Sequence, residues 1–144
     1  MTQVVFFTGV VDRLGFVQRL LRKKYREGAR VAVYGPAPVL LRLDNQLWTA
    51  DPLEFLPHIR VRETTALAPW LCERTPIWLL DQPRPELGCD TAVNLGWDDV
   101  PALLGHTRLA EVIGLGDEER QAGRLRWRAY EANGCALQHL PQNA

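Results

Sequence analysis

The chain has 144 residues, of which 47% are hydrophobic and 24% are charged. This composition excludes a disordered chain and predicts one globular domain over residues 1–144. Lysine and arginine together number 17, as do aspartate and glutamate, so the formal net charge at pH 7 is zero. Because no overall positive field would hold a nucleic-acid backbone, tight direct binding of nucleic acid is not expected.

Membrane and secretion signals are absent from the sequence. No apolar run approaches the roughly 20 residues of a membrane helix. The N-terminus lacks the basic start of a signal peptide. We therefore expect a cytoplasmic protein that does not contact a membrane.

Residue types that carry catalysis are scarce. The chain contains no serine, and its two lysines, Lys23 and Lys24, are adjacent. This removes every serine nucleophile and leaves little room for a phosphate-binding or Schiff-base lysine. The cysteines and histidines are too scattered for a disulfide framework or a zinc site, so no metal or cofactor is expected. They are Cys72, Cys89, Cys135, His58, His106 and His139.

Two pairs of neighbouring carboxylates are the remaining candidates for acid–base chemistry. They are Asp98 with Asp99 and Glu118 with Glu119. Neighbouring residues on a helix point about 100° apart, so neither pair can face one substrate. No catalytic residue is predicted, and we expect no enzymatic activity.

The first half of the chain predicts two strands that alternate with two helices. Residues 4–8 form an apolar run typical of a buried strand, and residues 12–27 have the period of an amphipathic helix closed by Gly28. Residues 31–34 predict a second strand. Gly35 and Pro36 then open a second helix. Its expected inward stripe is Leu40, Leu43 and Leu47.

The second half continues the alternation after residues 58–76, which the pattern does not assign. The expected elements are strands at 77–80, 92–95 and 108–113, a surface loop at 83–90, a short helix near 98–104, and a long helix from Asp117 to near Gly134. Asp117 is the expected cap of that helix. The chain is therefore predicted to be a three-layer, Rossmann-like α/β domain with a mostly parallel five-stranded sheet and helices on both faces.

A dinucleotide fingerprint is missing from this pattern. Gly9 is the one glycine after the first strand, where a dinucleotide fold uses Gly-x-Gly-x-x-Gly to approach a pyrophosphate. Gly114-Leu115-Gly116 is followed by three acidic residues that would repel an anion. A small nucleotide-binding α/β enzyme is kept as the alternative function, because ligands often bind at the carboxyl ends of such strands.

The last predicted helix carries a cationic face. Arg120, Arg124 and Arg128 are spaced four residues apart, and Trp127 lies beside them. This face suits a short acidic peptide with an aromatic anchor, or a platform for unpaired bases. Alternatively, it is a solvated face whose arginines pair with Glu119 or Glu131. The stripe expected to pack against the sheet is Ala122, Leu125, Ala129 and Ala132.

Two further surfaces are candidates. The apolar segment from Trp48 to Pro57 includes Phe55 and Leu56, which either fold into the core or form a partner site. The first helix has a basic face that could bind single strands, but without interleaved aromatic residues we expect it to be solvated. Its members are Arg13, Arg19, Arg22, Lys23, Lys24 and Arg26.

Two motifs carry a resemblance to a known family. The sequence Leu43-Asp44-Asn45-Gln46-Leu47-Trp48, followed by Phe55-Leu56-Pro57-His58, resembles the chi subunit of bacterial DNA polymerase III. Members of that family carry a similar Leu-Asp-x-x-Leu-Trp and Phe-x-Pro-His. The closing Arg124-x-Arg126-Trp127-Arg128-Ala129-Tyr130-Glu131-x-x-Gly134 is also similar, with Trp127 where the family more often has tyrosine and Arg128 where it often has lysine. The resemblance covers essentially the whole chain.

The resemblance implies a bacterial, non-catalytic adaptor that binds no nucleotide. Such an adaptor joins the clamp loader, through the psi subunit, to the acidic C-terminal tail of the single-stranded-DNA-binding protein. The tail site that it implies is Arg124, Trp127 and Arg128. The psi-contact site that it implies is Trp48, Phe55, Leu56 and Pro57, a segment also implicated in pairing with a repair helicase.

Overall fold

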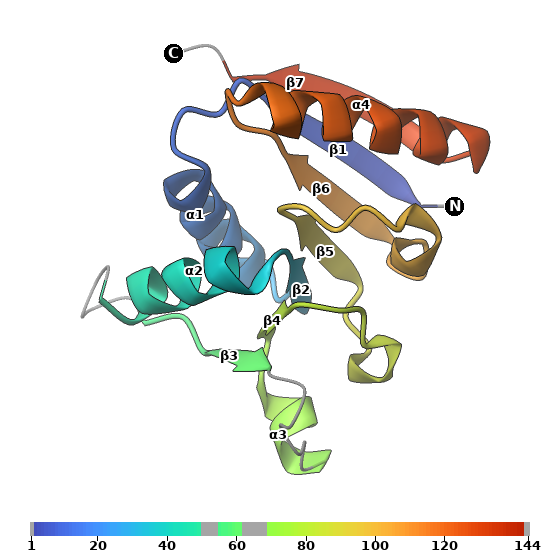
Figure 1. The fold of residues 1–144 in the computed structure, drawn as a ribbon. Helices are drawn as coiled ribbons and strands as arrows, with labels where there is room; N and C mark the ends of the chain where they lie inside the picture. Colours follow the sequence, from blue (N-terminus) through green and yellow to red (C-terminus); the bar gives the residue numbers. More distant parts are fainter. Residues whose placement is uncertain (1, 50–54, 62–68, 143–144) are drawn as a thin grey trace.

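A computed structural model describes residues 2–49, 55–61 and 69–142. Over these ranges the chain forms a seven-stranded sheet in the order β3-β4-β2-β5-β6-β1-β7 (Figure 1). Every pair of neighbouring strands is parallel. The strands are β1 (Gln3–Thr8), β2 (Val31–Tyr34), β3 (His58–Val61), β4 (Ile77–Leu80), β5 (Thr91–Asn94), β6 (Arg108–Val112) and β7 (Ala136–Pro141).

Helices cover both faces of this sheet. They are α1 (Arg13–Arg26), α2 (Ala37–Thr49), α3 (Pro69–Arg74) and α4 (Asp117–Ala132), with 3₁₀ turns η1 (Pro85–Leu87) and η2 (Val100–Leu103). Side chains of a strand alternate between faces, so Val31 and Val33 pack with α1 and α2, whereas Ala32 and Tyr34 face the side that α4 covers. The α/β class and the helices on both faces are confirmed. No helix in the described ranges is long and apolar enough to cross a membrane.

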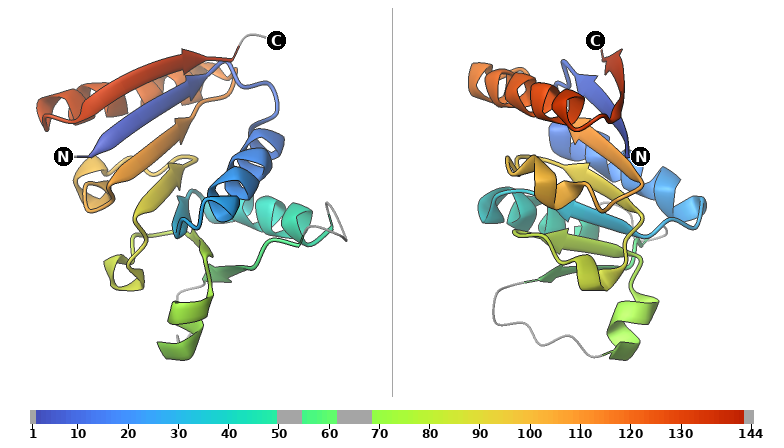
Figure 2. Two further views of the ribbon diagram at one scale, coloured as in Figure 1. Left: turned by 180° about the vertical axis from the view of Figure 1, so that it is seen from behind. Right: turned by 90° about the vertical axis from the view of Figure 1, so that its right-hand side faces the viewer.

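The predicted number of five strands is wrong, because both edge strands were missed. β3 and β7 lie at opposite edges of the sheet (Figure 2). An edge strand needs no continuous apolar run, and five of the six residues of β7 are exposed. β3 is only four residues long and contains His58 and Arg60. α3 also lies within the stretch that the sequence left unassigned.

The ends of the helices follow from local chemistry. α1 begins after Asp12, whose carboxylate accepts a hydrogen bond from the Gly15 amide at 3.1 Å. The prediction that Asp117 caps the last helix is wrong, because Gly116 is the N-cap and Asp117 is the first helical residue. Without a cap side chain, acidic residues of the first turn stabilise the N-terminus of α4 through the helix dipole.

The sheet has a topological switch point between β6 and β1. These strands are neighbours, yet α1 follows β1 on one face and α4 follows β6 on the other. In α/β proteins the carboxyl ends of two such strands form the crevice in which ligands bind. The side chains that fill or border this crevice therefore decide what the fold can hold.

Candidate functional site

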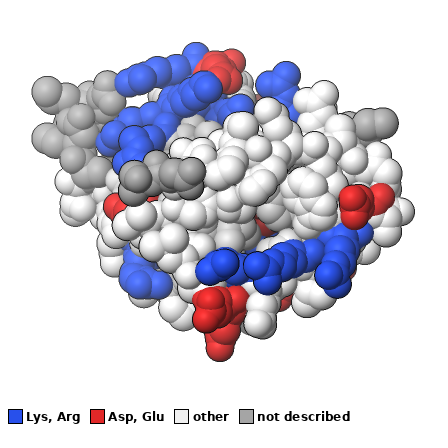
Figure 3. Space-filling view, turned by 90° about the horizontal axis from the view of Figure 1, so that it is seen from above, with Lys and Arg blue, Asp and Glu red and all other residues white. Residues whose placement is uncertain are grey.

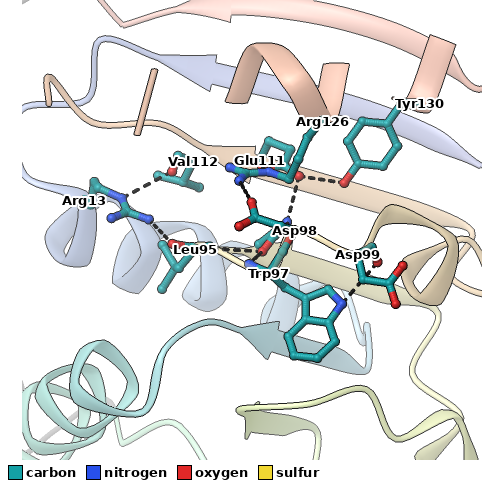
Figure 4. A network of polar contacts seen from close by, with 11 residues as sticks. Arg13, Leu95, Trp97, Asp98, Asp99, Glu111, Val112, Arg126 and Tyr130 are labelled. Carbon is teal, nitrogen blue, oxygen red and sulfur yellow. Dashed lines mark hydrogen bonds and ion pairs between the residues drawn. The ribbon is translucent and has the colours of Figure 1, made fainter. Parts of the chain in front are cut away.

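The orientation of α4 is set by a buried polar network at its centre (Figure 4). The Nε of Arg126 donates to Oε1 of Glu111 on β6 at 3.0 Å. The second carboxylate oxygen accepts from Tyr130 Oη at 2.6 Å and from Asn94 Nδ2 at 2.8 Å. Arg126 also donates to Asp98 at 2.7 Å. Every oxygen of the Glu111 carboxylate thus has a donor, as a buried charge requires.

Burial dominates the electrostatics of this network. It raises the pKa of Glu111, while Arg126 and the donors from Tyr130 and Asn94 act in the opposite direction. Burial and then the Glu111 charge raise the pKa of Tyr130, so its hydroxyl stays protonated and keeps donating. The pKa of Arg126 is also raised, because attraction by Glu111 and Asp98 outweighs the opposing effect of its burial.

This network corrects the predicted inward stripe of α4 at two of its four positions, since Ala129 packs against the core and Ala122 is half-buried. Leu125 is 65% exposed and Ala132 is also exposed, whereas Gly123, Arg126 and Tyr130 are buried. A helix residue lies about 100° from its neighbour, so turning Arg126 toward Glu111 turns Leu125 toward solvent. The predicted stripe is therefore wrong at Leu125 and Ala132, because an arginine makes the central contact with the sheet.

With Arg126 turned inward, the other cationic residues of α4 border a groove against β1, β7 and the turn that follows β6. The groove has a volume of about 550 Å³. Arg120, Arg124 and Arg128 line it together with Trp127, and Phe6 and Ile113 contribute apolar surface. Figure 3 shows this end of the molecule, where lysine and arginine atoms run in a row beside a largely uncharged surface. The structure thus brings Arg124, Trp127 and Arg128 together.

Trp127 is an apolar platform within this groove. Its ring packs edge-on against Phe6 with centroids 5.0 Å apart, yet the side chain stays half-buried. Arg124 and Arg128 are exposed and form no ion pair with any residue that the structure describes. Arg120 lies 3.8 Å from the exposed Asp117, a weak surface contact. The predicted pairing of the arginines with Glu119 or Glu131 is therefore not seen among the described residues.

Gly123 lets α4 approach the sheet closely at this groove. A Cβ added to Gly123 would lie 2.9 Å from Cδ1 of Ile113, which is too close for ordinary contact. Any larger side chain at this helical position would displace Ile113 or fill the groove. The shape of the groove therefore depends on a residue that carries no functional group.

An internal ion pair occupies the switch point beside the groove. Arg13 of α1 pairs with Glu119 of α4, and its Nε donates to the Val112 carbonyl at 3.3 Å. The Glu119 carboxylate lies against Gly114, where an added Cβ would be 2.7 Å from Oε2. An acidic side chain thus covers the turn at which a nucleotide-binding fold exposes backbone amides to phosphate.

The second predicted site divides into surface and core. Trp48 is 61% exposed and Phe55 is 46% exposed, and their rings pack against each other at a 35° tilt with centroids 5.0 Å apart. Leu56 is 5% exposed and belongs to the hydrophobic core, whereas Pro57 is half-buried. Two large aromatic rings together in water are unusual for a monomer, so Trp48 and Phe55 form the candidate contact surface. Residues 50–54 of this segment lie outside the described residues.

His58 holds this aromatic pair in place. Its Nδ1 is 2.6 Å from the Leu56 carbonyl and its Nε2 is 3.0 Å from Oδ1 of Asp44 on α2. The imidazole centroid is 5.1 Å from the Trp48 ring and 5.8 Å from the Phe55 ring. Sequence reasoning quoted Asp44 and His58 as motif residues but missed that they bond to each other.

The basic face of α1 is partly used within the protein. Arg13 pairs with Glu119, and Lys24 lies 3.8 Å from Glu27. Tyr25 is the large aromatic residue exposed on this helix, and no ring of another described residue packs against it as Phe55 does against Trp48. The face thus resembles a solvated helix surface more than a stacking platform for bases.

Comparison with protein families matches residues 1–138 to the family described as DNA polymerase III chi subunit, HolC. The chain belongs to this family. The match includes α4 with its groove residues, and also the aromatic pair with His58. No curated protein matches the chain closely enough to add a relative. Membership of the family gives the protein an accessory role in DNA replication, as a subunit of DNA polymerase III.

Proposed function

We propose that the protein is a non-catalytic adaptor that holds two replication proteins at once. One is the acidic C-terminal tail of the single-stranded-DNA-binding protein, and the other is the psi subunit of the clamp loader. The observation that carries this proposal is the separation of the two candidate sites. The groove lies beside β7 and the aromatic pair lies beside β3. These two strands are the opposite edges of the sheet (Figures 1 and 2).

The groove supports the tail as its ligand through charge and shape. Arginine presents planar donors that match carboxylates, and exposed Arg124 and Arg128 have no internal carboxylate partner among the described residues. The half-buried indole of Trp127 and the Phe6 ring offer an apolar surface for a terminal aromatic side chain. A volume of about 550 Å³ accommodates such a ring with the residues before it.

The aromatic pair supports a protein partner of a different kind. Trp48 and Phe55 present a continuous apolar surface with little charge of its own, which suits a hydrophobic anchor on the psi subunit. Pro57 borders this surface, while Leu56 supports it from the core. A repair helicase that used the same surface would compete with psi, since both would cover the same two rings.

The alternative function is a small nucleotide-binding enzyme, and no observation in the structure favours it. The Arg13–Glu119 ion pair occupies the switch point, and Glu119 would repel a phosphate there. Direct binding of single-stranded DNA through α1 is a weaker alternative, because Arg13 and Lys24 already pair with carboxylates of the protein. We also infer that residues 1–144 act as one domain in the bacterial cytoplasm, without a cofactor.

Isothermal titration calorimetry with three ligands tests the proposed function. The ligands are an acidic peptide that ends in Asp-Phe, a mononucleotide and an oligothymidine. We expect the peptide to bind with a Kd of about 1 μM, or roughly −8 kcal/mol, and to bind more weakly as salt is raised. The mononucleotide and the oligothymidine should give no heat. Tight binding of the mononucleotide without a response to the peptide would reverse the order of the two functions.

A further inference from the structure

His139 faces the groove from the strand opposite α4. It lies on β7, where it is paired in register with Phe6 of β1. Its side chain lines the same groove as Arg124, Trp127 and Arg128. His139 lies just beyond residues 1–138, which match the family, so the family assignment says nothing of this residue.

The imidazole of His139 is held on one side and open on the other. Its Nε2 is 2.6 Å from the hydroxyl oxygen of Thr8, and its ring approaches the Trp127 ring edge-on at 6.4 Å between centroids. Nδ1 forms no hydrogen bond with any residue in the described ranges. A hydroxyl both donates and accepts, so Thr8 can bond to the neutral and to the protonated ring. Protonation therefore adds a charge without releasing the ring.

Among the described residues that line the groove with His139, the charged ones are all arginines, and the nearby Glu119 carboxylate is paired with Arg13. α4 contributes Arg120, Arg124 and Arg128 to the groove, whereas the lining from β1 and from the turn after β6 carries no charge. No carboxylate is among the described residues that line the groove. Within the described part of the chain, a protonated His139 thus has no anionic partner in the groove, and a ligand can supply one. A carboxylate that enters the groove would stabilise the imidazolium through a charge-assisted hydrogen bond.

We propose that His139 is a ligand-binding residue of the groove, whose protonated imidazole donates from Nδ1 to a carboxylate of an acidic chain terminus. This inference rests on the proposed function of the groove and names an additional contact within it. Binding at this contact takes up a proton, because the ligand stabilises the charged form of the ring. By linkage the affinity then increases as the pH falls across the range in which histidine titrates.

Calorimetric titration of the wild type and of His139→Gln tests this inference. The Asp-Phe peptide is titrated at about pH 6 and about pH 8.5, where arginines and the peptide carboxylates keep their charge. We expect the wild type to bind roughly three to five times more tightly at the lower pH. His139→Gln should bind equally at both, near the wild-type affinity at the higher pH. Buffers of different ionisation enthalpy should show proton uptake by the wild type and not by the variant.

A second variant separates charge from shape. His139→Lys carries a positive charge at both pH values, so its affinity should be nearly independent of pH and at least equal to that of His139→Gln. His58 and His106 remain in both variants, so a pH dependence that they cause would persist. An unchanged pH dependence in His139→Gln overturns the role of His139 while leaving the groove intact. Absence of peptide binding by the wild type at either pH overturns the proposed function as well.

Discussion

Arg126 and Glu111 meet inside the interface between α4 and β6, with 3.0 Å between Nε and Oε1. This contact fixes the rotation of α4 about its axis. The residues on either side of Arg126 must then point elsewhere, and Trp127 turns to the groove while Leu125 turns to solvent. The candidate binding face is thus positioned by a charged pair that does not itself line the groove.

Arg126→Ala should destabilise the fold strongly. It leaves the fully buried Glu111 carboxylate without its cationic partner, and breaking a buried pair on one side typically costs about 3 to 5 kcal/mol. Urea unfolding measures the change in the free energy of unfolding. Arg124→Ala, on the exposed face of the same helix, is the matched control and should change stability by less than about 0.5 kcal/mol. Equal stability of the two variants would show that the network does not hold α4.

Arg128→Ala should weaken the binding of an acidic peptide without affecting the fold. The loss of a charge-assisted contact is expected to cost about 1 to 3 kcal/mol of binding free energy, measured by calorimetry at low salt. Arg19→Ala is the control, because Arg19 is an exposed arginine of α1 that does not line the groove. If both variants lose affinity equally, the peptide responds to overall charge and not to the groove.

Phe55→Ala and Leu56→Ala should separate binding from stability at adjacent positions. Phe55 is half-exposed, so its truncation should abolish capture of a psi subunit while changing stability by about 1 kcal/mol or less. Leu56 lies in the core, so its truncation should cost about 2 to 5 kcal/mol of stability. Pull-down and thermal unfolding report the two effects. If Phe55→Ala lost stability but still captured psi, the Phe55 ring would belong to the core and this surface would not be a partner site.

Stability should fall in mild acid because of His106. Burial lowers the pKa of His106 below its usual 6.5, against weaker opposing effects of the Cys89 carbonyl and Asp90. The unfolded chain therefore takes up this proton at a higher pH than the folded protein does. The resulting contribution to stability is complete above about pH 6.5 and is lost as the pH falls through the lowered pKa.

Urea unfolding at about pH 7.5 and about pH 5.5 checks this dependence. The wild type should be less stable at the lower pH, and His106→Gln should show a smaller decrease between the two conditions. His139→Gln, at an exposed position, should keep the decrease of the wild type. A decrease of the same size in His106→Gln would assign the effect to other groups.

The central strands and the first two helices could be predicted from the sequence, because their apolar periods are long and continuous. β3 and β7 could not be predicted in this way, because edge strands need no continuous apolar run. Arg126 shows a further limit. Arg126 is the same residue type as the exposed arginines around it, and its partner Glu111 is remote in sequence. Only the fold therefore reveals which arginine is buried. The groove residues on α4 could be proposed from their spacing in the sequence. The place of His139 in the groove could be recognised only once β7 was seen to lie beside β1.

A ternary titration tests the adaptor function most directly. The Asp-Phe peptide is titrated into the protein alone and into the purified complex of the protein with a psi subunit, at the same salt and pH. Because the two candidate sites lie at opposite edges of the sheet, the peptide should bind both samples with a Kd that agrees within about twofold. Loss of peptide binding in the psi complex would contradict a protein that holds both partners at once.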